Sequence, residues 1–534
     1  MTKKISPKDQ ATISERSAPA TRSVAVIDIG TSAIRMAIAE IRGVSEISIL
    51  ETLSQAVQLG RDTFTKGFLE RETVEECIRI LKSYQQILSE YQITKKSQLR
   101  VVATSAVREA DNRLAFVDRI YSATGIEVEP IEEAEVNRIT YLSIQPLLKL
   151  IPETSASRSI ITEVGGGSTE VLVVRGTDVD HAHTYRLGSL RLRESLEAER
   201  VPFHIQREII ENQIEQIVQQ IVHDVPSEDP ISMIAIGGDV RFAANQLISD
   251  RPSEKLVKIP LKDLEGFVDR ITMLSPEELV KKYHLSFSDA ETLGPALLSY
   301  LQLAHRFHLD NILVTRMSLR DGLLQEMARE GLWSEEFNKQ IVNSAMEICR
   351  KFQIDIGHAK RVAELSLQLF EQLKANHQLD AHYGLILEIA ALLHEIGLYV
   401  SNNSYHKHTM YLIRNSELFG LNQTNVLLVA LVARYHRRAL PKPTHDGYAS
   451  LNRDQRIAVS KLASLLRVAE ALDRSRSGRI RKFDCEILRQ KLILKIHNID
   501  DITLEQLALK QAGKLFEETF GMQIMLRADS PSER

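Results

Sequence analysis

Two segments of the chain carry the residue types that bind phosphate and a divalent cation. The first reads VAVIDIGTS over residues 24–32, and the second reads IITEVGGGSTE over residues 160–170. Glycine lets the backbone approach an anion, N–H and hydroxyl groups donate to phosphate oxygens, and a carboxylate at a strand end can hold a cation. Apolar β-branched runs flank each turn, so both segments predict strand, tight turn, strand.

Both segments also share one order of acid, apolar residue, glycine and hydroxyl. An internally duplicated nucleotide-binding fold would leave such a repetition in the sequence. We therefore expect the two turns to face each other across one cleft and to hold a phosphate chain from both sides. The alternative is that each segment is a β-hairpin whose turn needs glycine.

Length, charge and cysteine content limit the kinds of protein that this chain can be. With 534 residues it should form roughly three or four domains. A formal net charge of -4 gives no global basic field for nucleic acid, so a polyanion must meet a local basic patch. The cysteines are few and far apart, which favours a reducing cytosol. We find no signal-peptide core and no run of eighteen apolar residues, so we expect a cytoplasmic protein that does not enter a membrane.

Hydrophobic periodicity divides the chain into segments of different type. Strands alternate with helices over residues 21–141 and again over 142–332, which predicts two α/β domains. Residues 335–480 read as successive helices, and 481–534 mix strands with a helix over 504–520, which predicts a small α+β domain. The polar and charged residues 1–20 are expected to be a disordered tail.

Further motifs lie between the two glycine segments and after them. They are TSAVREADN at 104–112, RLGS at 186–189, SLRDG at 318–322, LLHEIG at 392–397 and RYHRR at 434–438. Together these motifs resemble the exopolyphosphatase and guanosine pentaphosphate phosphatase (Ppx/GppA) family in its long form. The resemblance runs from about Val24 to at least Ser475. It implies two actin-like (ribonuclease H-like) α/β domains, an all-α HD-like domain and a small α+β C-terminal domain.

The resemblance implies a phosphatase that uses Mg²⁺. The partner would be inorganic polyphosphate, which loses its terminal phosphate, or guanosine pentaphosphate. Such a reaction needs a cation, donors to the phosphate oxygens and a base for the attacking water. By this resemblance Asp28 and Glu163 would hold Mg²⁺, Arg108 would clamp a phosphate, and Glu170 would have a catalytic role. The expected phosphate-binding residues of the two turns are Gly30, Thr31, Ser32, Gly165, Gly166, Gly167 and Ser168.

The sequence departs from the family pattern at three positions. Ser32 replaces the usual Asn, Glu163 replaces the usual Asp, and Val136 aligns with the catalytic glutamate of the family. Because valine cannot take a proton from water, either a neighbouring carboxylate has taken over or hydrolysis is weak or absent. Glu135 is the first choice, followed by Glu132 and Glu133. The alternative is that these acids form a solvated first helical turn.

The helical region carries a second candidate metal site. His358, His394, Glu395 and Asp473 follow the order of the HD phosphohydrolases, although Glu395 stands where Asp belongs. These side chains could bind a metal through nitrogen and oxygen, or the domain could be a degenerate HD fold that binds the substrate chain.

A cluster of basic residues in the same region suits a long polyanion. Arg434, His436, Arg437 and Arg438 lie close together in sequence, and residues 406–408 read His-Lys-His. Arg437 and Arg438 are therefore expected to bind chain phosphates away from the reacting one. The alternative is a solvated charged face.

The residues and the resemblance together favour an exopolyphosphatase-like hydrolase. Two other interpretations remain: a catalytically impaired protein that binds polyphosphate or an alarmone, and an ATP-dependent kinase of the same fold. The short turn at 237–239 disfavours the kinase. A homodimer is expected from the family alone.

Overall fold

The computed structural model describes residues 21–43, 46–148, 158–198, 201, 203–225, 231–248, 255–329, 335–416, 418–437, 439–497, 499 and 501–529. These residues form two compact units. The first contains the described residues up to Pro130 together with 319–329, and the second contains 131–318 and the residues after 334.

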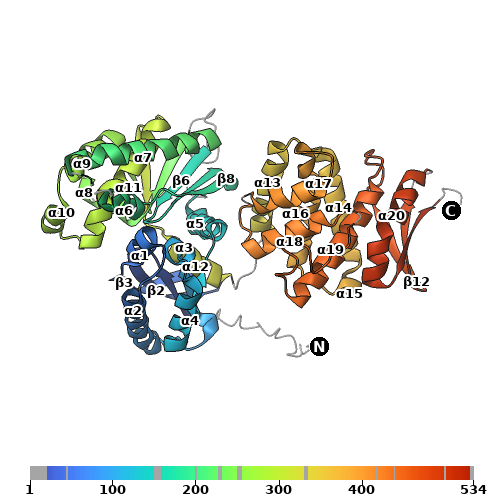
Figure 1. Ribbon diagram of the computed structural model, residues 1–534, viewed down its shortest axis with the longest axis horizontal. Helices are drawn as coiled ribbons and strands as arrows, with labels where there is room; N and C mark the ends of the chain where they lie inside the picture. The colour runs from blue at the N-terminus through green and yellow to red at the C-terminus, as the bar shows by residue number, and fades with distance from the viewer. Residues whose placement is uncertain are drawn as a thin grey trace, which may run out of the picture. The chain divides into compact units, whose positions relative to one another are not determined.

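The first unit is built on a five-stranded sheet with the strand order β3-β2-β1-β4-β5. β1 to β3 form an antiparallel meander, and β4 and β5 continue the sheet parallel to β1. The strands are β1 (Thr21–Ile29), β2 (Ala33–Arg42), β3 (Glu46–Ala56), β4 (Leu99–Ala103) and β5 (Glu129–Pro130). Its helices are α1 (Leu59–Lys66), α2 (Arg71–Glu90), α3 (Ser105–Glu109), α4 (Arg113–Thr124) and α12 (Leu319–Ala328). In Figure 1 they are coloured blue to cyan, except for α12, which comes from much later in the sequence.

The second unit contains a six-stranded sheet with the order β10-β11-β9-β6-β7-β8. The strands are β6 (Arg158–Val164), β7 (Thr169–Arg175), β8 (Asp178–Tyr185), β9 (Ile231–Ile236), β10 (Leu256–Pro260) and β11 (Asn311–Thr315). Alternate residues along β6 enter different cores. Ile160 packs in a core with the helices between β8 and β11, whereas Ile161 packs in a core with α5 and the helices after residue 334. The helices of this α/β part are α5 (Glu133–Leu148), α6 (Ser189–Ala198), α7 (Phe203–Asp224), α8 (Gly238–Leu247), α9 (Leu261–Thr272), α10 (Pro276–Tyr283) and α11 (Phe287–Arg306).

The two sheets repeat one topology. In each, three consecutive strands form an antiparallel meander, and a fourth strand pairs parallel with the first strand of the meander. A further parallel strand follows in both sheets, and β10 adds an antiparallel edge to the second. The internal duplication that the two glycine segments predict is therefore present in the fold.

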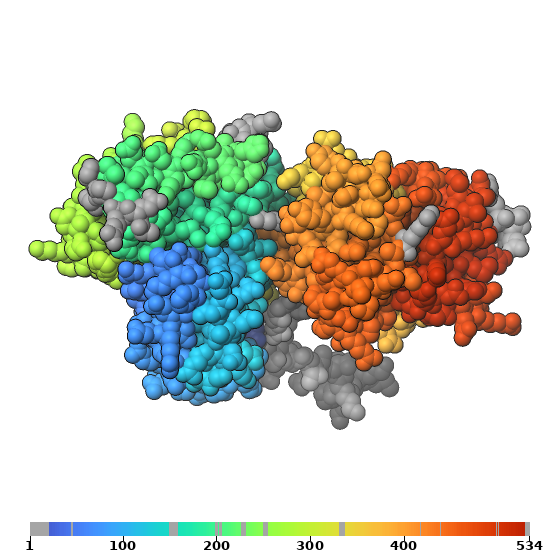
Figure 2. Space-filling view, viewed as in Figure 1, coloured from blue at the N-terminus to red at the C-terminus, as the bar shows by residue number. Residues whose placement is uncertain are grey.

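The rest of the second unit is helical and ends in a small sheet. The helices are α13 (Glu335–Lys351), α14 (Ile356–Gln372), α15 (Lys374–His377), α16 (His382–Leu393), α17 (Tyr405–Arg414), α18 (Gln423–Arg434) and α19 (Arg453–Leu472). β12 (Phe483–Leu488), β13 (Lys491–His497) and β14 (Gln523–Asp529) form the sheet, with α20 (Thr503–Phe520) joining the parallel pair β13 and β14. α20 packs on α19, and the space-filling view shows these last residues closely packed on the helices (Figure 2).

α12 differs from its predicted place. The sequence predicts that residues 142–332 form one domain, but α12 packs on β1 and β2 of the first sheet. An amphipathic helix reveals its buried face but not which sheet covers that face. Among the described residues, every helix is too short or too polar to cross a lipid bilayer. The tail over residues 1–20 lies outside the described residues.

Candidate functional site

The first glycine turn lies between β1 and β2, as the sequence predicts. The Gly30 N–H donates to the Ala33 carbonyl over 3.0 Å and closes the turn. Asp28 is buried near the end of β1 and lies opposite Arg35 on β2. Its Oδ2 is 3.5 Å from Nη1 of Arg320 on α12, while its Oδ1 is buried and has no hydrogen-bond partner among the described residues. A buried carboxylate oxygen in this state is suited to a cation.

Arg108 belongs to the same end of the first sheet. β4 ends beside β1, where the Thr104 N–H donates to the Ile29 carbonyl over 3.2 Å. α3 begins at the next residue, so the short helix that carries Arg108 starts beside the first glycine turn. The Arg108 side chain is buried, which is unusual for arginine and indicates a specific role.

The second glycine turn repeats the geometry of the first. It joins β6 to β7, and the Gly165 N–H donates to the Ser168 carbonyl over 2.8 Å. Glu163 and Glu170 are directly opposite each other in this strand pair, so both carboxylates project from the same face of the sheet. Ser168 Oγ donates to Glu170 Oε1 over 2.7 Å, and both side chains are buried. Two facing carboxylates form a donor set that Mg²⁺ prefers.

Gly188 fixes the position of this second turn. The start of α6 donates N–H groups to the turn: Ser189 to the Gly165 carbonyl over 2.9 Å and Leu190 to the Gly166 carbonyl over 3.0 Å. This close approach brings Gly188 against the turn, where a Cβ would lie 2.3 Å from the Gly166 oxygen. Only glycine fits at this position.

The start of α5 contains the candidate base. Both oxygens of Glu135 accept hydrogen bonds from the guanidinium of Arg138, over 2.5 and 2.8 Å, and Arg138 is itself buried. Val136 is also buried. The structure therefore gives Glu135 a structural ion pair in addition to any role in catalysis.

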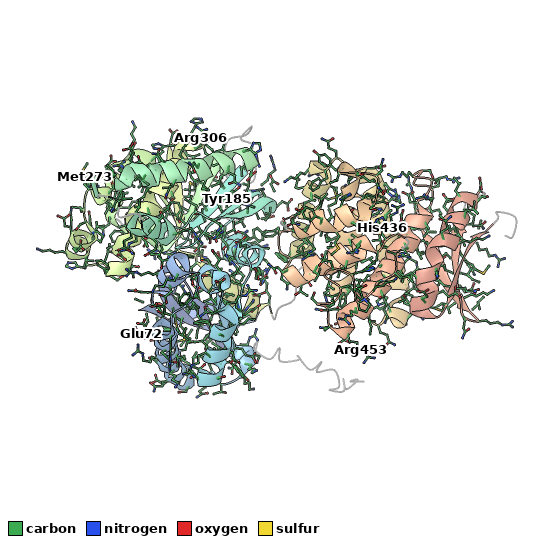
Figure 3. All side chains as sticks on the ribbon, in the orientation of Figure 1. Glu72, Tyr185, Met273, Arg306, His436 and Arg453 are labelled. Atoms are coloured by element: carbon green, nitrogen blue, oxygen red, sulfur yellow. The ribbon has the colours of Figure 1, made fainter. Side chains whose placement is uncertain are left out.

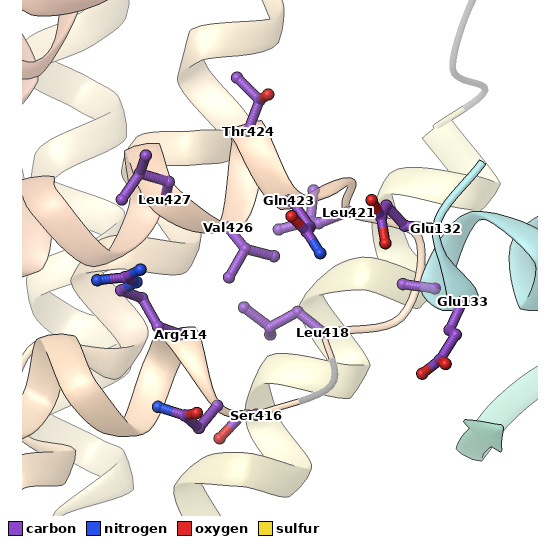
Figure 4. Close-up of a pocket in the computed structure, with 12 residues that line it drawn as sticks. Glu132, Glu133, Arg414, Ser416, Leu418, Leu421, Gln423, Thr424, Val426 and Leu427 are labelled. Carbon is purple, nitrogen blue, oxygen red and sulfur yellow. The ribbon is translucent and has the colours of Figure 1, made fainter. Parts of the chain in front are cut away.

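Glu132 and Glu133 instead line a cavity of about 530 Å³. They lie on one side of it and Arg414 of α17 on the other, with side chains around the start of α18 between them (Figure 4). This cavity belongs wholly to the second unit. The two carboxylates are thus candidates to face a ligand there.

In the helical region, the four candidate metal ligands are brought together. One ligand atom each of His358, His394 and Glu395 lies within 4.8 Å of the others, and all three side chains are buried. Asp473 contacts His358 through a 2.8 Å hydrogen bond between Oδ2 and Nδ1. His436, labelled in Figure 3, packs its ring 5.1 Å from that of His394. Burial lowers the pKa of His394 to about 4, so its imidazole is neutral at pH 7.

The basic cluster is only partly exposed. Arg437 is exposed and its guanidinium lies 4.8 Å from the Tyr405 ring centroid. His436 is buried and donates or accepts a 3.0 Å hydrogen bond with the Tyr405 hydroxyl. Arg438 lies outside the described residues. The predicted track for chain phosphates therefore stays a prediction that rests on Arg437.

Sequence reasoning gave no role to three residues that shape the turns. Arg35 and Arg320 flank Asp28, and Gly188 supports the second turn. Strand alternation in a tight hairpin could have placed Arg35 opposite Asp28. The two glycine turns belong to different units, so their predicted meeting across one cleft stays a prediction.

Comparisons with known proteins agree with this geometry. A model of the Ppx/GppA phosphatase family matches residues 37–330, and a model of Ppx/GppA phosphatase domain III matches residues 342–518. The chain is similar to a solved exopolyphosphatase from Cytophaga hutchinsonii, with 21% identity and a TM-score of 0.52 over 58% of this chain and 99% of that one. It is also similar to a solved exopolyphosphatase-like protein, with 20% identity and a TM-score of 0.51 over 59% and 99%.

These structural likenesses show the fold of the α/β part, and they confirm the actin-like prediction. The HD-like character of the helical region stays a prediction. Since the family model alone spans more than half of the sequence, the chain belongs to the Ppx/GppA phosphatase family.

Proposed function

We propose that this protein releases terminal phosphate from inorganic polyphosphate in a Mg²⁺-dependent reaction. One observation carries the proposal: two copies of one sheet each place a buried or partly buried acid just before a glycine turn. Anion-binding turns beside carboxylates are what phosphoryl transfer requires, because this reaction depends on positioning and charge neutralisation.

The residues present fit Mg²⁺. Asp28 Oδ1 is a buried oxygen without a hydrogen-bond partner among the described atoms, and Glu163 faces Glu170 across the β6 and β7 pair. We propose that Asp28 at the first turn and Glu163 at the second are each Mg²⁺ ligands, and that bound Mg²⁺ would neutralise charge on the phosphate oxygens. The turn N–H groups, with Thr31 and Ser168, would then orient the terminal phosphate.

Arg108 would hold a phosphate from the side of the first turn. Its guanidinium is a fork of donors that suits phosphate, and its helix starts where β1 and β4 end. Arg35 and Arg320, which lie around Asp28, would add positive charge at the same end of the sheet.

The buried free thiols of Cys77 and Cys349 are compatible with our proposal of a cytoplasmic location.

A binding protein without hydrolysis is the second candidate. Two features favour it: Val136, which the family resemblance aligns with the catalytic glutamate, is buried, and Arg138 holds both oxygens of the adjacent Glu135. In that case the turns would bind polyphosphate or guanosine pentaphosphate without releasing phosphate.

Phosphate release with Mg²⁺ from long polyphosphate, tripolyphosphate and guanosine pentaphosphate, measured side by side, separates these candidates. We expect release from long polyphosphate to be fastest. Binding of all three without release would support the second candidate and contradict the proposal.

Variants of the α5 start identify the base. If Glu135 is the base, Glu135→Gln should lower kcat about 10²-fold or more with little change in substrate binding. Glu132→Gln and Glu133→Gln remove equal charge beside the same helix start and test the two alternative bases, so a comparable loss of kcat in either variant alone would assign the role to that residue instead. Val136→Glu should raise activity if the natural enzyme is merely impaired, and Val136→Gln controls for the new polar side chain.

A further inference from the structure

Four helix ends meet around the buried histidines of the helical region. His358 lies in the first turn of α14, His394 follows the last residue of α16, His436 follows α18, and Asp473 follows α19. Three of these ends are helix C-termini, which carry partial negative charge. Glu395 and Asp473 add two buried carboxylates. The point where the helices meet therefore favours a cation.

Hydrogen bonds fix which nitrogen each histidine offers. Asp473 Oδ2 lies 2.8 Å from His358 Nδ1, and its Oδ1 accepts from the Gly478 N–H over 3.1 Å, so both ring and carboxylate are held in place. His394 Nδ1 lies 2.7 Å from the Ala391 carbonyl, which can only accept. Both rings therefore carry a proton on Nδ1, so in the neutral imidazole the lone pair lies on Nε2. A carboxylate or carbonyl behind the ring is the usual support of a metal-binding histidine.

His394 Nε2 is the atom that this packing leaves unsatisfied. The side chain is fully buried, and Nε2 has no hydrogen-bond partner among the described residues. A buried lone pair without a partner costs free energy unless a ligand satisfies it. His436 does not serve as its donor, because its own Nε2 lies 3.0 Å from the Tyr405 hydroxyl.

We propose that His358, His394 and Glu395 bind one divalent metal ion of the first-row transition series, with Zn²⁺ as the expected ion. Two imidazoles and a carboxylate are a borderline donor set, suited to Zn²⁺, Co²⁺ or Mn²⁺ and poor for Mg²⁺. Ligand atoms around a tetrahedral ion lie roughly 3.4 Å apart, given bonds of about 2.1 Å. From separations within 4.8 Å, side-chain shifts of about an ångström complete the site. A fourth position then stays open to water or to an anionic ligand.

Arg476 contacts the Glu395 carboxylate. Its Nη2 contacts Glu395 Oε1, its Nη1 lies 3.5 Å from Asp355, and its side chain is 44% exposed. An exposed guanidinium can move aside when a metal ion binds. Removal of Arg476 should therefore strengthen metal binding, whereas a purely structural ion-pair network would only lose stability.

Metal content of the full chain tests the site directly. The protein is stripped with a chelator, exposed to Zn²⁺ and desalted, and bound metal is measured by mass spectrometry. We expect one Zn²⁺ per chain, and a visible d–d spectrum when Co²⁺ replaces it. Glu395→Gln and His358→Gln should lose the ion and the spectrum, while His382→Ala, at an exposed position on the helix that precedes His394, should keep both. The ion should raise Tm in the natural protein and not in Glu395→Gln.

Two further variants distinguish this metal site from a structural ion-pair network and from the phosphatase site. Arg476→Ala should lower the Kd for Zn²⁺ by up to about fivefold, because Zn²⁺ then no longer has to displace the partly exposed ion pair of Arg476 with Glu395. Asp28→Asn should keep the bound Zn²⁺, because Asp28 belongs to the proposed phosphatase site and not to this one. Absence of Zn²⁺ from the natural protein, or Zn²⁺ that survives both Glu395→Gln and His358→Gln, would overturn the proposal while leaving the proposed phosphatase function untouched.

Discussion

A methyl group at Gly188 should displace the second glycine turn. An ideal Cβ at this position would lie 2.3 Å from the Gly166 oxygen, 2.4 Å from the Gly167 carbonyl carbon and 2.5 Å from Gly167 Cα. Real Cβ atoms essentially never come within 3.0 Å of another atom, so the turn or the start of α6 must move by ~0.7 Å. All three neighbours are backbone atoms, which cannot rotate away as a side chain could.

The displacement allows the size of the effect to be estimated. Overpacking of this kind costs typically about 1–3 kcal/mol of unfolding free energy. A shift approaching 1 Å in the groups that position a substrate costs about 10²-fold in rate. We therefore expect Gly188→Ala to fold, to unfold at lower urea concentration and to lose about two orders of magnitude in kcat/KM for polyphosphate.

Gly266→Ala is the matched control. Gly266 lies inside α9 of the same unit, and a Cβ there meets only the end of the flexible Arg270 side chain, at 3.8 Å. This substitution should be neutral or stabilising by up to ~1 kcal/mol, because alanine favours helix over glycine. Urea unfolding and phosphate release are measured for both variants. Gly188→Ala with activity within twofold of the natural protein would refute the assignment of this turn to the site.

Three further predictions concern other parts of the chain. Asp28→Asn keeps the shape of the side chain and removes its charge, so phosphate release should fall at least ~10²-fold and lose its dependence on Mg²⁺; an unchanged Mg²⁺ titration would exclude Asp28 as a ligand. Arg437→Glu should weaken binding of long polyphosphate, most strongly at low salt, and leave tripolyphosphate nearly unchanged; equal losses for both in a salt series would argue against a track for the chain. Burial, aided by His183, lowers the pKa of His181 to about 4, so the unfolded state takes up a proton at higher pH than the folded state does. The stability that neutral His181 provides is therefore lost as pH falls from about 6.5 toward 4. In His181→Gln the urea midpoint of unfolding should depend less on pH over this range, and a fall as steep as that of the natural protein would contradict the prediction.

Local patterns in the sequence predicted the elements of the fold closely. A helix over 504–520 was expected, and α20 spans Thr503–Phe520. Both glycine segments form a turn between paired strands. These features depend on apolar periodicity, caps and glycine over a few residues, and such signals are read directly from the chain.

The contacts that complete the sites were not predictable in the same way. Arg320 meets Asp28 because α12 packs on the first sheet, and no local pattern reveals which sheet a distant helix covers. Gly188 required knowledge of how closely α6 approaches the turn. The pair of Glu135 with Arg138 is different, because acid and base three residues apart on a helix are a recognisable signal.

Product analysis with end-labelled long polyphosphate tests the proposed terminal phosphate release most directly. Incubation with Mg²⁺ and the natural protein, followed by gel separation and measurement of free phosphate, shows where the chain is cut. We predict that free phosphate appears from the first time points, that the label leaves the chain ends, and that chains shorten without internal fragments. Bound but intact polyphosphate, or internal fragments without free phosphate, would contradict terminal release.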